Sequence, residues 1–465
     1  MEQLAPACSS PQAWARARRH LLSHLVCFGR HTITGLLRLQ DRTQQDWTAD
    51  YRFYAGEHFD ENKVFAHVRS QIETALPTQA PLVAAMDDSL LRKSGRKISG
   101  VRYLRDPMSP PFHVNFVRGL RVLQISAALP EGSQGAARLI PVDFQQAALP
   151  VKPRKQAPAH LHEAYELERA KKNINLVGRQ RLAQLRKQMD ESGSAQRQLI
   201  VSIDGRFTNA TVLREVPERT TLVGRVRKDS VFFHPPQTQP QHGRKRKYGQ
   251  RCPNPLELLK DESVPWQKVQ AFAAGKHHEF EVKSLGPIYT QMDKALNPLR
   301  LVVVKPVRYR LTKTQTDRRE PAFLICTDPN LPLEKVLQYY LWRWDIEVNF
   351  RDEKTLLGVG QAQVRSEASS QHAPALAVAA YSLLLLAATQ VYGSGRPETF
   401  QCPRWHKRRP TQRATTNDLR NQVRYELWAS ALGRHFRPLS SSKQQNQNGP
   451  KCDLPLESAL FTSIK

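Results

Sequence analysis

The chain has 465 residues, which is enough for two or three domains, because a single hydrophobic core usually stops growing well before this length. Its 70 Lys and Arg residues outnumber its 42 Asp and Glu residues, and the formal net charge of +28 favours a nucleic acid as partner. The longest apolar run, residues 375–388, is too short to span a bilayer, and basic residues interrupt any signal-peptide core, so we expect a cytoplasmic protein without a membrane partner.

Residues 1–76 are predicted to form a helical, basic N-terminal domain. Leu, Val and Ile recur between Arg and His residues in a pattern typical of amphipathic helices, and the segment ends near two prolines. We expect the basic side chains to contact DNA. The same pattern also suits a plain helical bundle whose charges are only solvated, and the sequence leaves both interpretations open.

Residues 77–229 are predicted to form the first part of an α/β core in which two buried strands end in aspartates. The apolar run Leu82–Met86 leads into Asp87 and Asp88, and the run Leu199–Ile203 leads into Asp204. In open α/β sheets, ligands collect beyond the carboxyl ends of the strands. These aspartates are therefore candidate site residues. The charged segment between them, residues 160–191, is predicted to form one or two helices that cross the sheet.

Residues 230–330 are predicted to be an inserted, partly β region. They are rich in Pro and Gln, and apolar stretches typical of strands follow near 299–304 and 322–327. The insertion also carries a basic run formed by Arg244, Lys245, Arg246 and Lys247.

Residues 331–392 contain the most specific pattern of the sequence. One long helix is predicted over Leu333–Leu357, because this span contains neither Pro nor Gly. At about 100° per residue, four polar side chains of this helix fall within an arc of about 60°. They are Tyr340, Arg343, Glu347 and Lys354. A solvated face would also mix charges, but the apolar residues between them indicate a largely buried helix, in which charges need partners.

Residues 393–465 are predicted to be a basic C-terminal region with a flexible end. Its basic run includes Lys407, Arg408 and Arg409. We interpret this run, and the run at 244–247, as contacts to the DNA backbone, with solvated loops as the open alternative.

Three stretches of the sequence resemble bacterial DDE transposases of the insertion-sequence-four family. The spacing Tyr340-x2-Arg343-x3-Glu347-x6-Lys354 matches the Tyr-Arg-Glu-Lys signature of that family. Residues 86–95 resemble its first catalytic block, and residues 203–209 resemble its second. The resemblance implies an α/β fold, with an RNase H-like catalytic core, a β-rich insertion in residues 230–330, and helical N-terminal and C-terminal regions.

The resemblance also implies a chemistry for these residues. Asp87, Asp204 and Glu347 would be the catalytic carboxylates and the metal ligands, with Asp88 as the alternative to Asp87. Carboxylates suit two Mg²⁺ ions, for which Mn²⁺ could substitute, because Mg²⁺ is a hard cation that prefers oxygen ligands. Tyr340, Arg343 and Lys354 would contact the DNA.

The function implied is that of a DNA transposase, which cleaves double-stranded DNA at the ends of an insertion sequence and transfers the strands to a target as a homodimer. One alternative is an RNase H-like nuclease or recombinase without strand transfer. Another is a non-catalytic DNA-binding protein derived from a transposase. All three acidic positions are filled, so the sequence gives no sign of inactivation.

Overall fold

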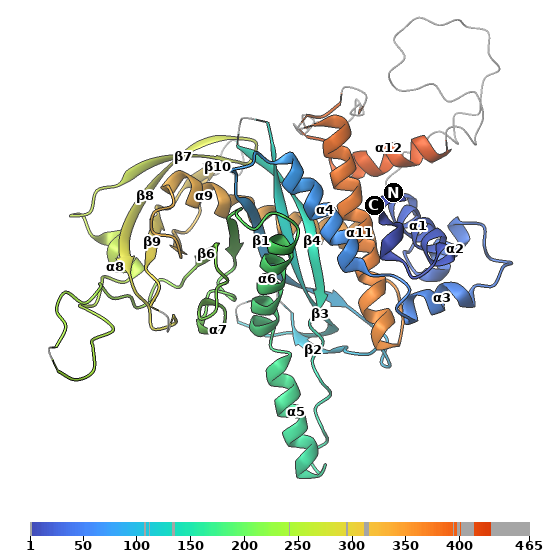
Figure 1. The fold of residues 1–465 in the computed structure, drawn as a ribbon, viewed down its shortest axis with the longest axis horizontal. Helices are drawn as coiled ribbons and strands as arrows, with labels where there is room; N and C mark the ends of the chain where they lie inside the picture. The colour runs from blue at the N-terminus through green and yellow to red at the C-terminus, as the bar shows by residue number, and fades with distance from the viewer. Residues whose placement is uncertain are drawn as a thin grey trace, which may run out of the picture.

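The computed structural model describes residues 2–428, apart from 107, 111, 133–134, 241, 294–295, 311–315, 394, 398–399 and 401–412. One mixed sheet of ten strands runs through the molecule (Figure 1). Its strands are β1 (Leu82–Arg92), β2 (Arg102–Arg105), β3 (Phe116–Glu131), β4 (Ala136–Gln146), β5 (Leu199–Ile203), β6 (Thr220–Arg225), β7 (Gln267–Ala273), β8 (Lys276–Ile288), β9 (Leu299–Val304) and β12 (Ala322–Cys326). Their order is β2-β3-β1-β5-β6-β12-β9-β8-β7, and β4 also pairs with β3.

The first half of the sheet has the topology of an RNase H-like core. β4, β3 and β1 form an antiparallel meander, whereas β5 and β6 run parallel to β1. Parallel neighbours need crossover connections, and helices supply them here. They are α6 (Ile174–Glu191) before β5 and the short α7 (Ala210–Leu213) before β6. The predicted α/β fold class is therefore confirmed.

The inserted region continues the same sheet beyond β6. β12, β9, β8 and β7 follow one another in antiparallel pairs, and they lie at the left of Figure 1. The helix α8 (Pro255–Lys260) and a separate hairpin of β10 (Arg308–Arg310) and β11 (Thr316–Arg318) complete the region. β9 is buried on both faces, because its Leu and Val side chains alternate between two core clusters.

One face of the sheet is covered by helices from both ends of the chain. The N-terminal segment forms η1 (Glu2–Ala7), α1 (Pro11–Val26), α2 (Ile33–Leu39), α3 (Thr48–Ala55) and α4 (Glu61–Ala75). These helices pack around α11 (Glu367–Tyr392), which also lies against β4. In the described part of the chain, α11 is the one helix long and apolar enough to cross a membrane. Its apolar window is 67% buried inside the protein, so the run at 375–388 belongs to a core helix that is longer than predicted.

The opposite face is covered by two helices where the sequence predicted one. α9 (Leu333–Trp342) and α10 (Trp344–Thr355) meet at Arg343. A continuous α-helix would bond the Arg343 N–H to the Tyr339 carbonyl, but that oxygen accepts a hydrogen bond from the Ser202 hydroxyl at 2.9 Å. The Arg343 N–H bonds to the Tyr340 carbonyl instead, at 3.2 Å. A side chain inserted into the hydrogen-bond ladder thus breaks the helix.

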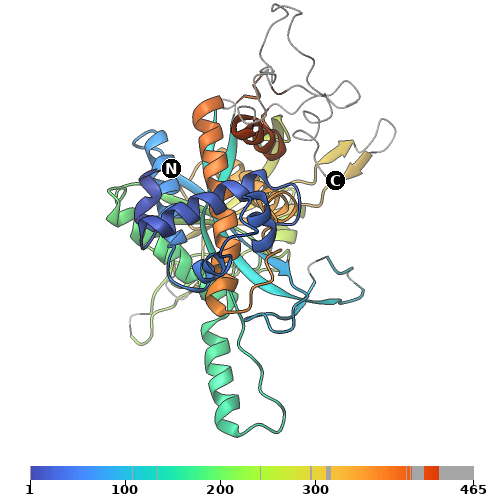
Figure 2. The same ribbon diagram turned by 90° about the vertical axis from the view of Figure 1, so that its right-hand side faces the viewer.

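The charged segment predicted to cross the sheet divides into two helices with different surroundings. α6 packs on the sheet through residues such as Leu182 and Leu185. The preceding helix, α5 (Ala159–Lys171), has no buried residue and projects away from the body in both ribbon views (Figures 1 and 2). The prediction is therefore right for α6 and wrong for α5.

The last described helix, α12 (Thr416–Trp428), returns to the N-terminal helices. Arg420 donates hydrogen bonds to the carbonyls of Leu25 and Cys27, and Arg424 donates to those of Val26 and Cys27. These carbonyls end α1 and have no partner within the helix. Two arginines from one end of the chain therefore cap the first long helix at the other end.

Candidate active site

Asp87 and Asp204 belong to neighbouring parallel strands beneath α9 and α10. Asp204 directly follows the end of β5, as predicted, but the prediction that the first strand ends at its aspartates is wrong. β1 continues past Asp87 to Arg92, because it stays paired with β3 after its pairing with β5 has ended at Met86. In β1, Val83 and Ala85 pack in the core under these helices, and Asp87 follows on the same face of the strand. In the neighbouring parallel strand β5, Ser202 points to this face, and Asp204 follows two residues later. Met86 and Ile203 are register partners, so each strand delivers its carboxylate at the next position.

Arg343 joins Asp87 to the glutamate on α10. Its guanidinium lies 2.9 Å from Asp87 Oδ2 and 3.2 Å from Glu347 Oε1, and it lies 5.6 Å from the ring centroid of Tyr340. Burial alone would lower the pKa of Arg343, but Tyr340 and the carboxylates of Asp87, Asp204 and Glu347 raise it. Two of the predicted carboxylates therefore contact one guanidinium, and the third acts on it through its charge.

The pKa of Asp87 reflects its buried and acidic surroundings. Burial raises the pKa of Asp87 to about 7, with Arg343 opposing the shift and Asp204 adding to it. A buried carboxylate beside another carboxylate binds a proton more readily. Among the described residues, no group of three His, Cys, Asp or Glu side chains is close enough to form a metal cluster on its own. Arg343 supplies the cationic charge at the centre.

Asp88 has different partners from Asp87. Its two carboxylate oxygens contact Arg121 Nε at 3.3 Å and Arg206 Nε at 3.2 Å. Burial raises the pKa of Asp88, and both arginines oppose that shift. Successive residues of a strand point to opposite faces, so Asp88 faces away from α10.

Lys354 lies further along β1 than the carboxylates. Its Nζ is 2.5 Å from the hydroxyl of Ser89 and 5.7 Å from the ring centroid of Phe350. Ser89 follows Asp87 by two residues and therefore points to the same face of β1. Burial lowers the pKa of Lys354, and Glu353 opposes the shift. A desolvated ammonium group thus lies next to the acidic cluster.

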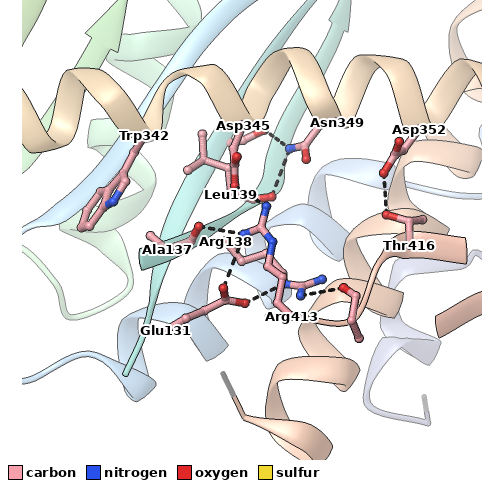
Figure 3. Close-up of polar contacts among 12 residues, drawn as sticks. Glu131, Ala137, Arg138, Leu139, Trp342, Asp345, Asn349, Asp352, Arg413 and Thr416 are labelled. Carbon is pink, nitrogen blue, oxygen red and sulfur yellow. Dashed lines mark hydrogen bonds and ion pairs between the residues drawn. The ribbon is translucent and has the colours of Figure 1, made fainter. Parts of the chain in front are cut away.

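The other side of α10 is fixed by polar contacts that the sequence did not reveal (Figure 3). Asn349 donates hydrogen bonds to the Ser126 hydroxyl and to the Leu139 carbonyl, both at 3.1 Å. Arg413 pairs with Asp345 at 2.9 Å and also contacts Glu131 and the Ala137 carbonyl. The Thr416 hydroxyl donates to Asp352 at 2.6 Å. These contacts orient α10, so that Glu347 faces the aspartates.

Sequence analysis missed Ser202, Asn349 and Arg413, because each acts through a partner that is remote in sequence. Only the position of Ser202, two residues before Asp204, gives a local signal. The predicted DNA-contacting run at 244–247 lies in an exposed loop. Its role stays a prediction. The run that contains Lys407, Arg408 and Arg409 lies outside the described residues.

Comparison with known proteins identifies the family. The DDE superfamily endonuclease family matches residues 4–283, which is more than half of the chain. The match includes Asp87, Asp88 and Asp204, and it ends before α9 and α10. None of the curated proteins that were compared matches the chain. With Asp87 within β1 and Asp204 directly after the neighbouring parallel strand β5 of an RNase H-like sheet, the chain belongs to the DDE superfamily endonucleases.

Proposed function

We propose that this endonuclease is a DNA transposase of the insertion-sequence-four type, in which Asp87, Asp204 and Glu347 bind the catalytic metal ions. The observation that carries the proposal is the arrangement around Arg343. One guanidinium contacts Asp87 from β1 and Glu347 from α10, and the charge of Asp204 from β5 acts on it as well. Arg343 therefore links a carboxylate of β1 to one of α10, and the charge of the carboxylate after β5 also reaches it.

The residues at this place fit a divalent cation. Burial raises the pKa of Asp87, and the charge of Asp204 adds to the shift, so a further positive charge would stabilise the ionised carboxylate. Asp87, Asp204 and Glu347 would hold Mg²⁺, or Mn²⁺ in its place, because hard cations prefer carboxylate oxygens. Two such ions would activate the attacking oxygen and stabilise the leaving oxygen of the phosphodiester. The two arginines on Asp88 favour Asp87 as the ligand.

The cationic side chains would position the DNA. Arg343 offers a planar fork that fits phosphate oxygens as well as carboxylates, so it could exchange its acidic partners for a phosphate. Lys354 would bind a phosphate as a point charge, and the phenol of Tyr340 would contact the same strand. The net charge of +28 favours duplex DNA, both at the element ends and at the target, with a homodimer to bring two ends together.

The proposal is tested with the full-length protein, Mg²⁺ and a plasmid that carries the DNA flanking its reading frame. We expect cleavage at the borders of the element and joining of the freed ends to other DNA. Asp204→Asn should bind DNA normally but cleave at background level, because it removes a charged ligand without changing the basic surface. The matched control is Asp229→Asn, since Asp229 is an exposed aspartate paired with Arg227.

The outcomes separate the competing functions. Cleavage without joined products would favour a nuclease or recombinase that lacks strand transfer. Specific DNA binding without any cleavage would favour a non-catalytic derivative. Wild-type cleavage by Asp204→Asn would show that this aspartate is not a metal ligand.

A further inference from the structure

An open groove of about 660 Å³ begins at Lys354 and follows the end of β1. Five cationic residues line it, and no acidic residue does. They are Arg30, Arg92, Lys93, Arg118 and Lys354. Apolar side chains of β1 and β3, including Leu91 and Val117, also line the groove. The groove therefore combines a strong positive charge with an apolar surface, and it starts at the proposed active site.

Four of the five cations of the groove have no carboxylate at ion-pair distance among the described residues. Within the described residues, Arg92 is the only one of the five with a carboxylate at ion-pair distance, that of Asp106 at 2.8 Å. Lys93 donates to two backbone carbonyls, and Arg118 donates to the carbonyls of Ser94 and Gly95. Burial lowers the pKa of Lys93 to about 8, as expected for a desolvated cation without a counter-charge. A polyanion would supply that charge.

An exposed arm begins where the groove ends. The arm runs from Tyr103 in β2 to Phe116 at the start of β3, with residues 107 and 111 outside the described part, and Figure 2 shows it extending away from the body at the lower right. Large apolar side chains lie exposed on it, with Phe112 at 90% and Met108 at 82% of full exposure. Tyr103 and Phe116 are also exposed. The Arg118 guanidinium lies 5.7 Å from the ring centroid of Tyr103, so the arm and the groove share one edge.

We propose that the groove and the arm together bind a single-stranded stretch of DNA next to the cleavage site, a proposal that rests on the proposed function. The phosphates lie along the cations of the groove, and unpaired bases stack on the aromatic side chains of the arm. A positively charged groove and exposed aromatic rings are the two features that proteins combine to bind single strands. A fully paired duplex hides the faces of its bases, so the arm would add little to duplex binding.

A second copy of this chain is the other possible occupant of an exposed apolar arm. Charge argues against it, because both copies carry a net charge of +28 and the groove beside the arm is cationic. Single-stranded DNA satisfies both the charge of the groove and the apolar rings of the arm.

The test is fluorescence anisotropy with the full-length protein in the absence of divalent metal. The probes are a labelled blunt duplex and the same duplex with a short single-stranded overhang at either end. We expect one of the overhang probes to bind about tenfold more tightly than the blunt duplex, as stacking of one base would give. Tyr103→Ala/Phe112→Ala should lose this preference and keep blunt-duplex binding. Trp47→Ala is the control, because Trp47 is an exposed aromatic residue outside the arm.

The groove is tested separately with Arg30→Ala, an exposed side chain whose removal leaves the core intact. Its loss should weaken binding of the overhang probe and lower the slope of log affinity against log salt by about 1, as expected for one phosphate contact. Lys187→Ala, which removes an exposed cation paired with Glu191 on α6, should leave that slope unchanged.

The possible results distinguish a failure of this inference from a failure of the proposed function. Equal binding of the blunt and overhang probes by the wild type, or a preference retained by Tyr103→Ala/Phe112→Ala, would overturn this inference and leave the proposed function intact. A change of oligomeric state in that variant without a change in probe preference would indicate a second copy on the arm, and would also overturn it. A wild type that binds no DNA at all would contradict the proposed function itself.

Discussion

Arg343 stabilises a set of carboxylates that would otherwise repel one another. Asp87, Asp204 and Glu347 all act on its guanidinium, and Asp87 still binds a proton more readily than an ordinary aspartate. Burial is the main cause of that raised pKa, and the charge of Asp204 adds to it. A buried site of this kind disfavours the ionised carboxylate and favours the binding of further positive charge.

The proposed role of Asp87 as a metal ligand predicts how metal binding depends on pH. Its pKa is about 7, and a metal ligand must be deprotonated, so binding competes with a proton below pH 7. Between pH 5.5 and 7, the affinity for Mg²⁺ or Mn²⁺ should rise by up to about tenfold per pH unit, and it should level off above pH 7. Calorimetric titration in buffers of different ionisation enthalpy measures both the affinity and the proton released. An affinity that is constant over this range would contradict the raised pKa.

The stability of the metal-free protein should depend on the same group. The folded-state pKa of Asp87 lies above its unfolded value of about 3.9, so the stabilisation it gives is fully present below pH 4 and is lost as pH rises through 7. Asp87→Asn mimics the protonated form. Relative to wild type, it should therefore gain stability between pH 4 and 7, by on the order of 1 kcal/mol per pH unit, and urea unfolding across this range measures the difference.

At the scale of elements, the break between α9 and α10 decides where Arg343 points. The Ser202 hydroxyl donates a hydrogen bond to the Tyr339 carbonyl, and Ser202 belongs to β5, the strand that Asp204 directly follows. One hydroxyl therefore links the geometry of the helix pair to the geometry of the aspartates. A regular helix through Arg343 would restore the missing backbone bond and turn α10 relative to α9.

Substitutions of Ser202 should separate activity from stability. Ser202→Ala frees the Tyr339 carbonyl for the Arg343 N–H, so we expect unchanged or higher stability and a cleavage rate lower by about 10- to 100-fold. Ser202→Thr keeps the hydroxyl but adds a methyl group at a fully buried position. It should lower the free energy of unfolding by about 1–3 kcal/mol and retain more activity than Ser202→Ala. Single-turnover cleavage and urea unfolding test both variants. If the loss of activity in both variants parallels their loss of stability, the hydroxyl has no positioning role.

The sequence predicted the strands better than the helices. Apolar runs that end in aspartates predicted β1 and β5, because a buried strand and its carboxylate are adjacent in the chain. The break at Arg343 was not predictable, since it depends on a hydroxyl 137 residues away, and the span itself contains no Pro or Gly. The exposure of α5 was missed for a similar reason. Its apolar residues recur at helical intervals, but no element of the sheet lies beneath them.

For the site, the residue types were predictable and their partners were not. The spacing of Glu347 and Lys354 predicted a common face, and both do lie on the side of α10 that faces β1. The choice between Asp87 and Asp88 depends on the two arginines that contact Asp88. These arginines come from β3 and from the loop after β5, so the sequence alone did not reveal the contacts. Contacts of this kind form only when the sheet is assembled.

At the scale of the whole molecule, the two ends of the described chain depend on each other. Arg420 and Arg424 satisfy the last carbonyls of α1, and the Arg424 guanidinium also lies 4.1 Å from the ring centroid of Phe28. Arg424→Ala leaves the Val26 carbonyl without its donor, while Arg420 still donates to Cys27, and it should lower the free energy of unfolding by about 1–3 kcal/mol. Arg227→Ala, which removes an exposed ion pair, should change it by less than about 1 kcal/mol. Urea unfolding followed by tryptophan fluorescence compares the two, and equal effects would rule out a structural role for the α12 contact.

The contact between α12 and α1 also sets an order of events during synthesis. Arg420 follows its partner Leu25 by 395 residues. At about 5–20 residues per second, a ribosome needs roughly 20–80 s to bridge that interval. Throughout this time the end of α1 stays hydrated, and from the completion of β5 until α10 is made, the two aspartate strands exist without Arg343 and Glu347. A nascent chain can thus expose basic helices long before it can assemble the acidic cluster, and the final closure of the fold follows the arrival of α10.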